Sequence, residues 1–336
     1  MPRGQAPTFW HGTQPVPRWA RVLVPLYRLL RLIDRARYAI GLRRVQHLPV
    51  PVIVIGNLTV GGSGKTPLTL ALIEALRAAG WHPGVVSRGY GGTQREPDLV
   101  TTADSALRVG DEPMLLQRLG QVPVAVGARR ADAARLLLPL GVDVILGDDG
   151  LQHRALGRDI EICVIDGVRR FGNGRLLPAG PLREPLARLV SVDFVVCNGG
   201  VARPGEVPMS LQPGAPRALV PVTTAQPPAP GAEVHAVAGI GDPTRFFASL
   251  RALGYRVREH AFADHRAYTL ADFAFDDATL PLLMTEKDAV KCAAFARPHW
   301  WALPVRAQLP PQFLAALQTR LNAVASPPLP RAGARR

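Results

Sequence analysis

The stretch Val52-Ile-Val-Ile-Gly-Asn-Leu-Thr-Val-Gly-Gly-Ser-Gly-Lys-Thr-Pro67 decides the fold. It begins with a β-branched apolar run that ends at Gly56, continues as a glycine-dense loop and closes on Gly64-Lys65-Thr66. The residues that follow read as a helix. A strand, a glycine-rich loop and a helix in this order are typical of a phosphate-binding loop. Its backbone N–H groups and the helix N-terminus present partial positive charge to phosphate oxygens.

We therefore expect this loop to bind a nucleoside triphosphate. Lys65 would reach the β- and γ-phosphates, and the Thr66 hydroxyl would hold Mg²⁺. Thr59 stands where the common pattern has a glycine, and two later glycines supply the flexibility instead. A plain tight turn is the alternative, which the Lys-Thr pair at the helix start disfavours. The expected nucleotide-binding residues are Thr59, Val60, Gly61, Gly62, Ser63, Gly64, Lys65 and Thr66.

Past the loop, strand-like and helix-like segments alternate. Alternation of this kind predicts an α/β fold like that of P-loop nucleoside triphosphatases, with a mostly parallel sheet flanked by helices. Ligands in such sheets bind beyond the carboxyl ends of the strands. We expect helices at 68–79, 113–119 and 129–138, and strands at 85–87, 122–126, 142–146, 160–165 and 192–196.

A second, smaller α/β lobe is expected after a connection rich in Pro, Gly and Ala. Its pattern is a strand at 234–238, a helix at 244–253 and further strands at 255–260 and 282–285. The expected division is an N-terminal helical region at 1–45, a P-loop core at 46–200, a linker at 201–233, the smaller lobe at 234–325 and a disordered tail at 326–336.

The composition describes a globular chain with a strong basic excess. Hydrophobic residues make up 47% of the 336 positions, and 40 basic against 26 acidic residues leave a net charge of +14. Such an excess indicates an anionic partner, either nucleic acid, an acidic membrane surface or a phosphorylated substrate. Three separated cysteines fit neither a disulfide framework nor a metal site, and no signal-peptide pattern is present. We therefore expect a cytoplasmic protein.

Residues 18–38 read as a basic amphipathic helix. Apolar side chains recur at three-and-four spacing, with arginines among them: Trp19, Val22, Leu23, Leu26, Leu29, Leu30 and Ile33 beside Arg21, Arg28, Arg31 and Arg35. A helix of this kind can lie in the headgroup region of an anionic bilayer. It can equally cover the protein core with its arginines in water, and the pattern leaves both readings open. The chain has no uninterrupted run of about 18 apolar residues, the length that a spanning helix needs.

Several polar residues occupy positions where chemistry is expected. Asp148 and Asp149 end an apolar strand, where a carboxylate commonly binds Mg²⁺, although a solvated Asp-Asp-Gly turn is the alternative. Asp111 opens a helix, so it reads either as an N-cap or as an acid that receives a hydroxyl proton. His265 suits proton relay, or is an ordinary surface or core residue. Three cations in turns are candidate clamps for substrate oxygens or plain surface charges: Arg88, Arg183 and Lys287.

Seven motifs occur in one order along the chain. They are Gly61-Gly-Ser-Gly-Lys-Thr-Pro67, Ser87-Arg-Gly-Tyr-Gly91, Val109-Gly-Asp-Glu-Pro113, Asp148-Asp-Gly-Leu-Gln-His153, Leu177-Pro-Ala-Gly-Pro-Leu-Arg-Glu-Pro185, Asp264-His265 and Thr285-Glu-Lys-Asp-Ala-Val-Lys291. Together they resemble the tetraacyldisaccharide 4′-kinase family of lipid A biosynthesis. The resemblance extends from the N-terminal helix to about Ala325.

The resemblance implies a phosphotransferase with an alcohol acceptor. It would move the γ-phosphate of ATP to the 4′-hydroxyl of a tetraacylated glucosamine disaccharide 1-phosphate. The family pairs an acid and a histidine as a catalytic dyad, which correspond here to Asp111 and His265. The implied Mg²⁺ site comprises Thr66, Asp148 and Asp149, with Glu112 nearby. The candidate substrate-binding residues are Arg88, Gln152, His153 and Arg183.

The resemblance also favours membrane contact for the N-terminal helix. It implies a peripheral protein on the cytoplasmic face of the inner membrane, with the anionic bilayer and the acylated substrate as partners. No nucleic acid and no protein partner is implied. A nucleotide-dependent switch would carry Asn-Lys-x-Asp after a late strand, but the comparable strand ends Val195-Val-Cys-Asn-Gly-Gly200. A nucleic-acid motor would need a basic groove interleaved with aromatics, which the sequence lacks.

Overall fold

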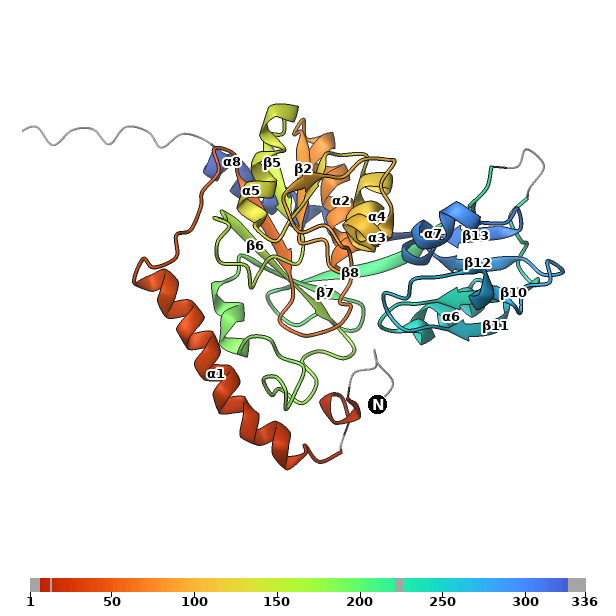
Figure 1. Ribbon diagram of the computed structural model, residues 1–336, viewed down its shortest axis with the longest axis horizontal. Helices are drawn as coiled ribbons and strands as arrows, with labels where there is room; N and C mark the ends of the chain where they lie inside the picture. The colour runs from red at the N-terminus through yellow and green to blue at the C-terminus, as the bar shows by residue number, and fades with distance from the viewer. Residues whose placement is uncertain (1–6, 13, 222–225, 326–336) are drawn as a thin grey trace, which may run out of the picture.

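The computed structural model describes residues 7–12, 14–221 and 226–325. It consists of a larger and a smaller lobe, and two antiparallel strands, β8 and β14, run between them (Figure 1). The α/β fold expected from the sequence is confirmed. The predicted disordered tail at 326–336 lies outside the described residues.

The larger lobe is built on a nine-stranded sheet in the order β14-β8-β7-β6-β1-β5-β2-β4-β3. All neighbours are parallel except the two edge pairs, β14 with β8 and β3 with β4. The strands are β1 Val52–Gly56, β2 Pro83–Ser87, β3 Asp98–Leu99, β4 Val124–Val126, β5 Val144–Gly147, β6 Ile160–Asp166, β7 Phe194–Asn198, β8 Glu206–Pro213 and β14 Val305–Gln308.

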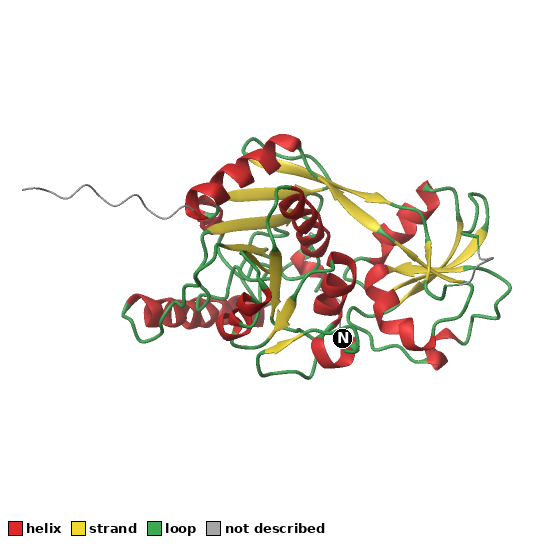
Figure 2. Cartoon of the chain, turned by 90° about the horizontal axis from the view of Figure 1, so that it is seen from above, coloured by secondary structure: helices red, strands yellow, loops and turns green. Residues whose placement is uncertain are grey.

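Helices cover both faces of this sheet (Figure 2). Over both lobes, the α-helices of the described residues are α1 Arg18–Ala39, α2 Lys65–Ala78, α3 Ala106–Val109, α4 Asp111–Gly120, α5 Arg130–Arg135, α6 Pro243–Ala252, α7 Glu286–Cys292 and α8 Pro311–Ala325. Of these, α6 and α7 belong to the smaller lobe. Short 3-10 helices are η1 Thr8–Trp10, η2 Leu138–Leu140, η3 Leu186–Ser191, η4 Leu270–Phe273 and η5 Ala293–Phe295.

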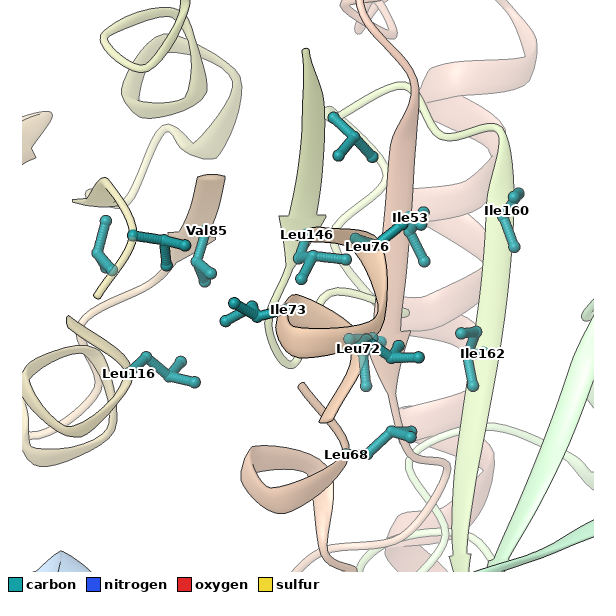
Figure 3. Close-up of a cluster of buried hydrophobic side chains, with 14 of the residues drawn as sticks. Ile53, Leu68, Leu72, Ile73, Leu76, Val85, Leu116, Leu146, Ile160 and Ile162 are labelled. Atoms are coloured by element: carbon teal, nitrogen blue, oxygen red, sulfur yellow. The ribbon is translucent and has the colours of Figure 1, made fainter. Parts of the chain in front are cut away.

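Strand β1 explains why the core has two layers. Successive side chains of a strand point to opposite faces, so Ile53 and Ile55 join one hydrophobic cluster while Val52 and Val54 join the other. On the first face, the apolar stripe of α2 packs against the strands (Figure 3). Burying one such aliphatic side chain contributes about 1.5–3 kcal/mol. This packing fixes α2, and with it the loop that precedes α2.

The smaller lobe has a five-stranded sheet in the order β11-β10-β12-β13-β9. Its strands are parallel except β9, which is antiparallel to β13. Their bounds are β9 Arg217–Ala218, β10 Glu233–Ala238, β11 Arg256–Ala261, β12 Leu282–Thr285 and β13 Trp300–Leu303.

The expected division of the chain differs from the structure at two places. The segment 201–233 was expected as a linker, yet it contains β8, which extends the larger sheet next to β7. Residues 305–325 were assigned to the smaller lobe, yet β14 and α8 return to the larger one. Phe313, Leu317 and Leu321 of α8 join the α2 cluster, and burial of these side chains holds the chain end there.

Candidate active site

The glycine-rich loop between β1 and α2 is held by its own backbone and by β7. Gly64, the N-cap of α2, has φ = +93°, a conformation that favours glycine. The side-chain amide of Asn198 donates to the carbonyl of Ser63 at 3.0 Å. A Cβ at position 64 would lie 2.3 Å from that amide nitrogen, so a larger residue would displace it. Helix α2 starts at Lys65 and has no side-chain cap, so its first N–H groups lack helical partners and are suited to bind an anion.

The first residues of the loop are held by the segment around Pro181. The N–H of Val60 donates to the carbonyl of Pro181 at 2.9 Å, and Thr59 forms an isolated β-bridge with Leu182. The N–H of Val60 is therefore not free for a phosphate. A Cβ on Gly61 or Gly62 would meet no atom within 4 Å, so this part of the loop borders open space.

Two acids meet the loop at the carboxyl edge of the sheet because β5, which precedes them, is paired with β1. The Nζ atom of Lys65 lies 3.5 Å from Oδ1 of Asp149. Arg183 donates to both carboxylate oxygens of Asp149, at 3.2 and 3.1 Å. Burial opposes ionisation of Asp149, but the charges of Lys65 and Arg183 outweigh it and lower the pKa to about 2.

Asp148 has a different environment. Its side chain is buried, and neither carboxylate oxygen has a hydrogen-bond partner within the described residues. Burial, followed by the charge of Glu112, raises its pKa to about 7. Across the described ranges, no group of three or more His, Cys, Asp or Glu side chains is arranged to hold a metal. An unpaired carboxylate near a phosphate-binding loop still suits Mg²⁺, because this ion usually takes few protein ligands and completes its shell with phosphate and water.

Asp111 and His265 meet across the two lobes. The Nδ1 atom of His265 lies 3.1 Å from Oδ1 and 3.0 Å from Oδ2 of Asp111. The N-cap interpretation of Asp111 is wrong, because Gly110 takes that position and Asp111 is the first residue of α4. Gly110 has φ = +95°, and a Cβ there would lie 2.7 Å from the carbonyl oxygen of Tyr90. This close packing places the start of α4 beside the loop after β2.

Lys287 of α7 joins the same cluster. Its Nζ atom lies 3.5 Å from Oδ2 of Asp111, 3.3 Å from Oε1 of Glu112 and 3.3 Å from Oδ1 of Asp264. Two of these acids are on α4 in the larger lobe, and the third precedes His265 in the smaller lobe. One lysine therefore neutralises carboxylates from both lobes.

The charges in this cluster support one another. Burial disfavours the ionised form of Asp111, but the hydrogen bond from His265 and the charge of Lys287 lower its pKa to about 2. The hydrogen bond to Asp111 raises the pKa of His265, against its burial. The pKa of Lys287 is also raised, since Glu112, Asp111 and Asp264 outweigh its burial. The arrangement is a carboxylate held ionised beside an imidazole that favours the protonated form.

The smaller lobe also borders the phosphate-binding loop. Arg245 of α6 lies 2.9 Å from Asp166, at the end of β6. Asp166 in turn pairs with Arg169, whose Nη2 donates to the carbonyl of Gly62 at 2.6 Å. A Cβ at Gly241 would lie 3.5 Å from the nitrogen of Gly62. The loop and the Asp111–His265 pair therefore share one interlobe boundary.

The four candidate substrate-binding residues fall into two groups. Gln152 accepts a hydrogen bond from Arg183 at 3.3 Å, and both therefore belong to the Asp149 network. The Nε2 atom of His153 is buried with no partner in the described part of the chain, and burial lowers the pKa of this histidine to about 4. Arg88 is exposed at the end of β2 and has no ion pair or hydrogen bond with any described residue.

Two residues at the site were not named as site residues in the sequence analysis. Arg130 lies in the helix expected at 129–138, and its side chain is buried and donates to the carbonyl of Asp149 at 2.8 Å. The ring of Tyr90 meets the ring of His265 edge-on, with centroids 5.1 Å apart. Neither role could be read from local patterns, because each depends on packing between distant segments.

Helix α1 lies on the outer side of the larger lobe, away from the smaller one (Figures 1 and 2). Its inner face packs through Ala20, Val24 and Tyr27, and Arg31 pairs with Glu184. Its large apolar side chains are otherwise exposed by 40–73%: Trp19, Val22, Leu23, Leu26, Leu29, Leu30, Leu32 and Ile33. Among the described residues, no helix combines the length and apolarity required to cross a bilayer.

Comparison with known proteins gives one consistent result. A sequence model of the family described as tetraacyldisaccharide-1-P 4′-kinase matches residues 18–322. The tetraacyldisaccharide 4′-kinase of Stenotrophomonas maltophilia is 49% identical, covering 95% of this chain and 97% of that protein, and that of Shewanella sp. MR-4 is 50% identical, covering 94% and 95%. The crystal structure of LpxK from Aquifex aeolicus in complex with ATP has a TM-score of 0.73 and 30% identity, covering 91% of this chain and 99% of that one. This chain belongs to the tetraacyldisaccharide-1-P 4′-kinase family.

Proposed function

We propose that the chain transfers the γ-phosphate of ATP to the 4′-hydroxyl of a tetraacylated glucosamine disaccharide 1-phosphate, a step in lipid A biosynthesis. The relatives bear the name of this activity, and the A. aeolicus structure is an ATP complex. The observation that carries the proposal is the Asp111–His265 pair, formed between the lobes at the boundary that also contains the phosphate-binding loop. A nucleotide switch has no need for such an acid and histidine pair beside its loop.

The nucleotide would bind with its phosphates on the loop. The α2 N-terminus and Lys65 supply positive charge to the phosphates, and Lys65 is already oriented by Asp149. Thr66 and Asp148 are the residues that fit Mg²⁺ best, with Asp149 and Glu112 nearby. The two unpaired oxygens of Asp148 support this assignment, since a buried carboxylate without donors or a cation is unfavourable. When bound, the ion would neutralise charge on the phosphate oxygens.

Asp111 would accept the proton of the attacking hydroxyl. Its low pKa keeps it ionised, and Oδ2 accepts no hydrogen bond of good geometry from the described residues. Phosphoryl transfer requires a carboxylate that orients the hydroxyl more than it requires a strong base, because the transition state is loose. His265 would hold the carboxylate in place and offset charge that develops during transfer.

The substrate would contact the edge of the same site. Arg183 and Gln152 lie around Asp149. Arg88 and the Nε2 atom of His153 have no hydrogen-bond partner among the described residues, so both remain available to a substrate. Guanidinium groups suit the phosphate and sugar oxygens of such a substrate.

The exposed face of α1 would lie in the headgroup region of an anionic bilayer, making the protein peripheral on the cytoplasmic face of the inner membrane. Its apolar side chains are exposed on one side of the helix, and Arg21, Arg28 and Arg35 lie on other exposed sides. The apolar surface would enter the interface while arginines contact anionic lipids. The acyl chains of the substrate would then remain in the bilayer while its sugar reaches the active site.

The test is product formation by the full chain. Purified protein with detergent-dispersed acylated disaccharide 1-phosphate and Mg-ATP should yield a bisphosphorylated lipid, and Lys65→Ala should abolish the product. Absence of product, together with lipid-independent GTP hydrolysis, would instead support a nucleotide switch.

A further inference from the structure

His265 has a strained backbone conformation within residues 262–268, which we call the histidine loop. Its φ is +59°, in the left-handed region that residues with a Cβ rarely adopt. A residue keeps such a conformation only where the surrounding structure holds it. The hydrogen bond with Asp111 holds the imidazole ring and not the main chain. The histidine loop therefore needs anchors inside the smaller lobe.

The first anchor is the end of β10. The N–H of Phe262 donates to the carbonyl of Ala238 at 2.9 Å. The N–H of Arg266 closes a turn on the carbonyl of Ala263 at 3.1 Å. A Cβ at Gly239 would lie 3.3 Å from the carbonyl oxygen of Ala263, so the histidine loop packs directly on the turn that follows β10.

The second anchor is Tyr268, three positions after His265. Its side chain is buried, and the centroid of its ring lies 5.2 Å from that of Phe262 and 5.5 Å from that of Phe273. Its hydroxyl donates to Oδ1 of Asp288 at 3.1 Å. The ring therefore belongs to the core of the smaller lobe, while the hydroxyl fixes the end of the histidine loop.

Asp288 is fully buried in α7 and joins several segments of the smaller lobe. Its Oδ2 accepts hydrogen bonds from the N–H of Gly239 at 2.9 Å and from the hydroxyl of Thr285 at 2.6 Å. The Nζ atom of Lys291 lies 2.7 Å from Oδ1 of Asp288 and 4.8 Å from the centre of the Tyr268 ring. Three donors and one cation thus surround this carboxylate, and such a network determines its position.

The same carboxylate helps to place the other parts of the lobe that face the active site. Lys287 is the preceding residue, and the side chain of Thr285 caps α7 by accepting from the N–H of Asp288 at 3.1 Å. The turn after β10 continues to Gly241, where a Cβ would lie 3.5 Å from the nitrogen of Gly62. The histidine loop, the start of α7 and the turn beside the phosphate-binding loop are therefore all tied to one side chain.

We propose that Tyr268 is a positioning residue, whose hydrogen bond to Asp288 holds the histidine loop so that His265 meets Asp111. The effect on turnover rests on the proposed function, whereas the position of His265 is measured without turnover. The alternative is that the hydroxyl of Tyr268 only stabilises the core of the smaller lobe. The two roles differ in whether loss of the hydroxyl moves His265.

Tyr268→Phe removes this hydroxyl and keeps the packing of the ring. Substitution of Asp288 would leave Lys291 buried without its counter-charge, so the variant is made at Tyr268. The titration of His265 in the full chain is followed by NMR, and its signal is identified by its absence in His265→Gln. The hydrogen bond to Asp111 raises the pKa of His265, so the variant should titrate several tenths of a pH unit lower, toward the ordinary value of about 6.5.

Tyr255→Phe is the matched control in the same lobe. Tyr255 is buried to the same degree as Tyr268, and its hydroxyl donates to the carbonyl of Pro228 at 2.8 Å, away from the histidine loop. The control should lose a similar amount of stability and leave the titration of His265 unchanged. An unchanged titration in Tyr268→Phe, or an equal shift in the control, would overturn the proposal.

Kinetics test whether Tyr268 acts through the histidine. With the acylated acceptor and Mg-ATP, Tyr268→Phe should lower kcat by about tenfold and keep KM for ATP within about twofold of wild type. In a His265→Gln background the same substitution should have no further effect on kcat, because the residue that it positions is already lost. An equal loss of kcat in both backgrounds would show that Tyr268 acts independently, and the proposal would be wrong. If no protein forms product while the titration shifts as expected, the proposed function fails and the positioning contact stands.

Discussion

The Nδ1 atom of His265 lies 3.0 Å from Oδ2 of Asp111, although 154 positions and an interlobe boundary separate the two residues. Each residue is held by its own lobe, Asp111 at the start of α4 and His265 in the loop after β11. The pair is therefore formed only when the lobes are packed together. Under the proposed function, any change that separates the lobes would weaken catalysis.

Asp111→Asn should reduce kcat by about 10²–10⁴-fold, because the amide cannot accept the hydroxyl proton. ATP affinity should stay within about threefold of wild type, since Asp111 contacts the smaller lobe rather than the loop. Steady-state kinetics and equilibrium binding of ATP check the two quantities. A collapse of ATP affinity would show that Asp111 is a nucleotide or metal ligand instead.

His265→Gln should destabilise the protein most in mildly acidic solution. The raised pKa of His265 means that its stabilising contribution is present below about pH 6.5 and is lost as pH rises through the raised value. The contribution of Asp111 is present above about pH 4 and is lost as pH falls toward 2. The difference in thermal midpoint between wild type and variant should therefore be larger at pH 5–6 than at pH 9. A difference independent of pH would exclude the ion pair.

Lys287→Met should leave three carboxylates without their shared cation. We expect kcat to fall by about tenfold, and the His265 titration, followed by NMR, to move to higher pH because the lysine charge disfavours imidazolium. Arg245→Met is the matched control. It removes another interlobe ion pair, the one to Asp166, and leaves the three carboxylates that contact Lys287 unchanged. An equal shift of the titration in this control would assign the effect to lobe separation alone.

Asp148→Asn should stabilise the nucleotide-free protein while impairing the kinase. The pKa of Asp148 is raised to about 7, so the folded state retains a proton that the unfolded chain loses near pH 4. Stability therefore falls as pH rises between these values, and an uncharged amide avoids the loss. The thermal midpoint of the variant should exceed that of the wild type increasingly from pH 5 to 7. A lower midpoint at pH 7 would mean that a cation or donor already satisfies the carboxylate.

Leu26→Glu/Leu30→Glu should weaken association with anionic vesicles by at least about tenfold, because two apolar side chains lose their favourable transfer from water. Both leucines are more than half exposed on α1. Leu140→Glu is the control, since Leu140 is exposed to the same degree as Leu26 but lies in η2. Vesicle flotation measures the binding. An equal loss of binding in the control would show that added negative charge, and not the loss of apolar surface on α1, causes the effect.

Local patterns predicted most elements of the larger lobe. The apolar run before Gly56 favours a strand and the spacing of apolar residues after Pro67 favours a helix. The structure has β1 and α2 at these places. The predictions were wrong where contacts between distant segments determine which sheet or lobe a segment joins. The segment 201–233 has little periodicity, yet β8 pairs with β7 because that edge offers free backbone groups. Helix α8 belongs to the larger lobe because its apolar stripe finds the α2 cluster.

The sequence by itself determined the phosphate-binding loop, the α/β class and the family, because these depend on residues that are close together in the chain or on motifs in order. Tertiary structure alone decided that Asp111, His265 and Lys287 form one charged cluster and that Arg130 is buried beside Asp149. Each of these contacts joins segments that no local preference links. They form because Val290 of α7 packs against the core of the larger lobe and α5 packs against the sheet, which brings the charges together where water no longer separates them.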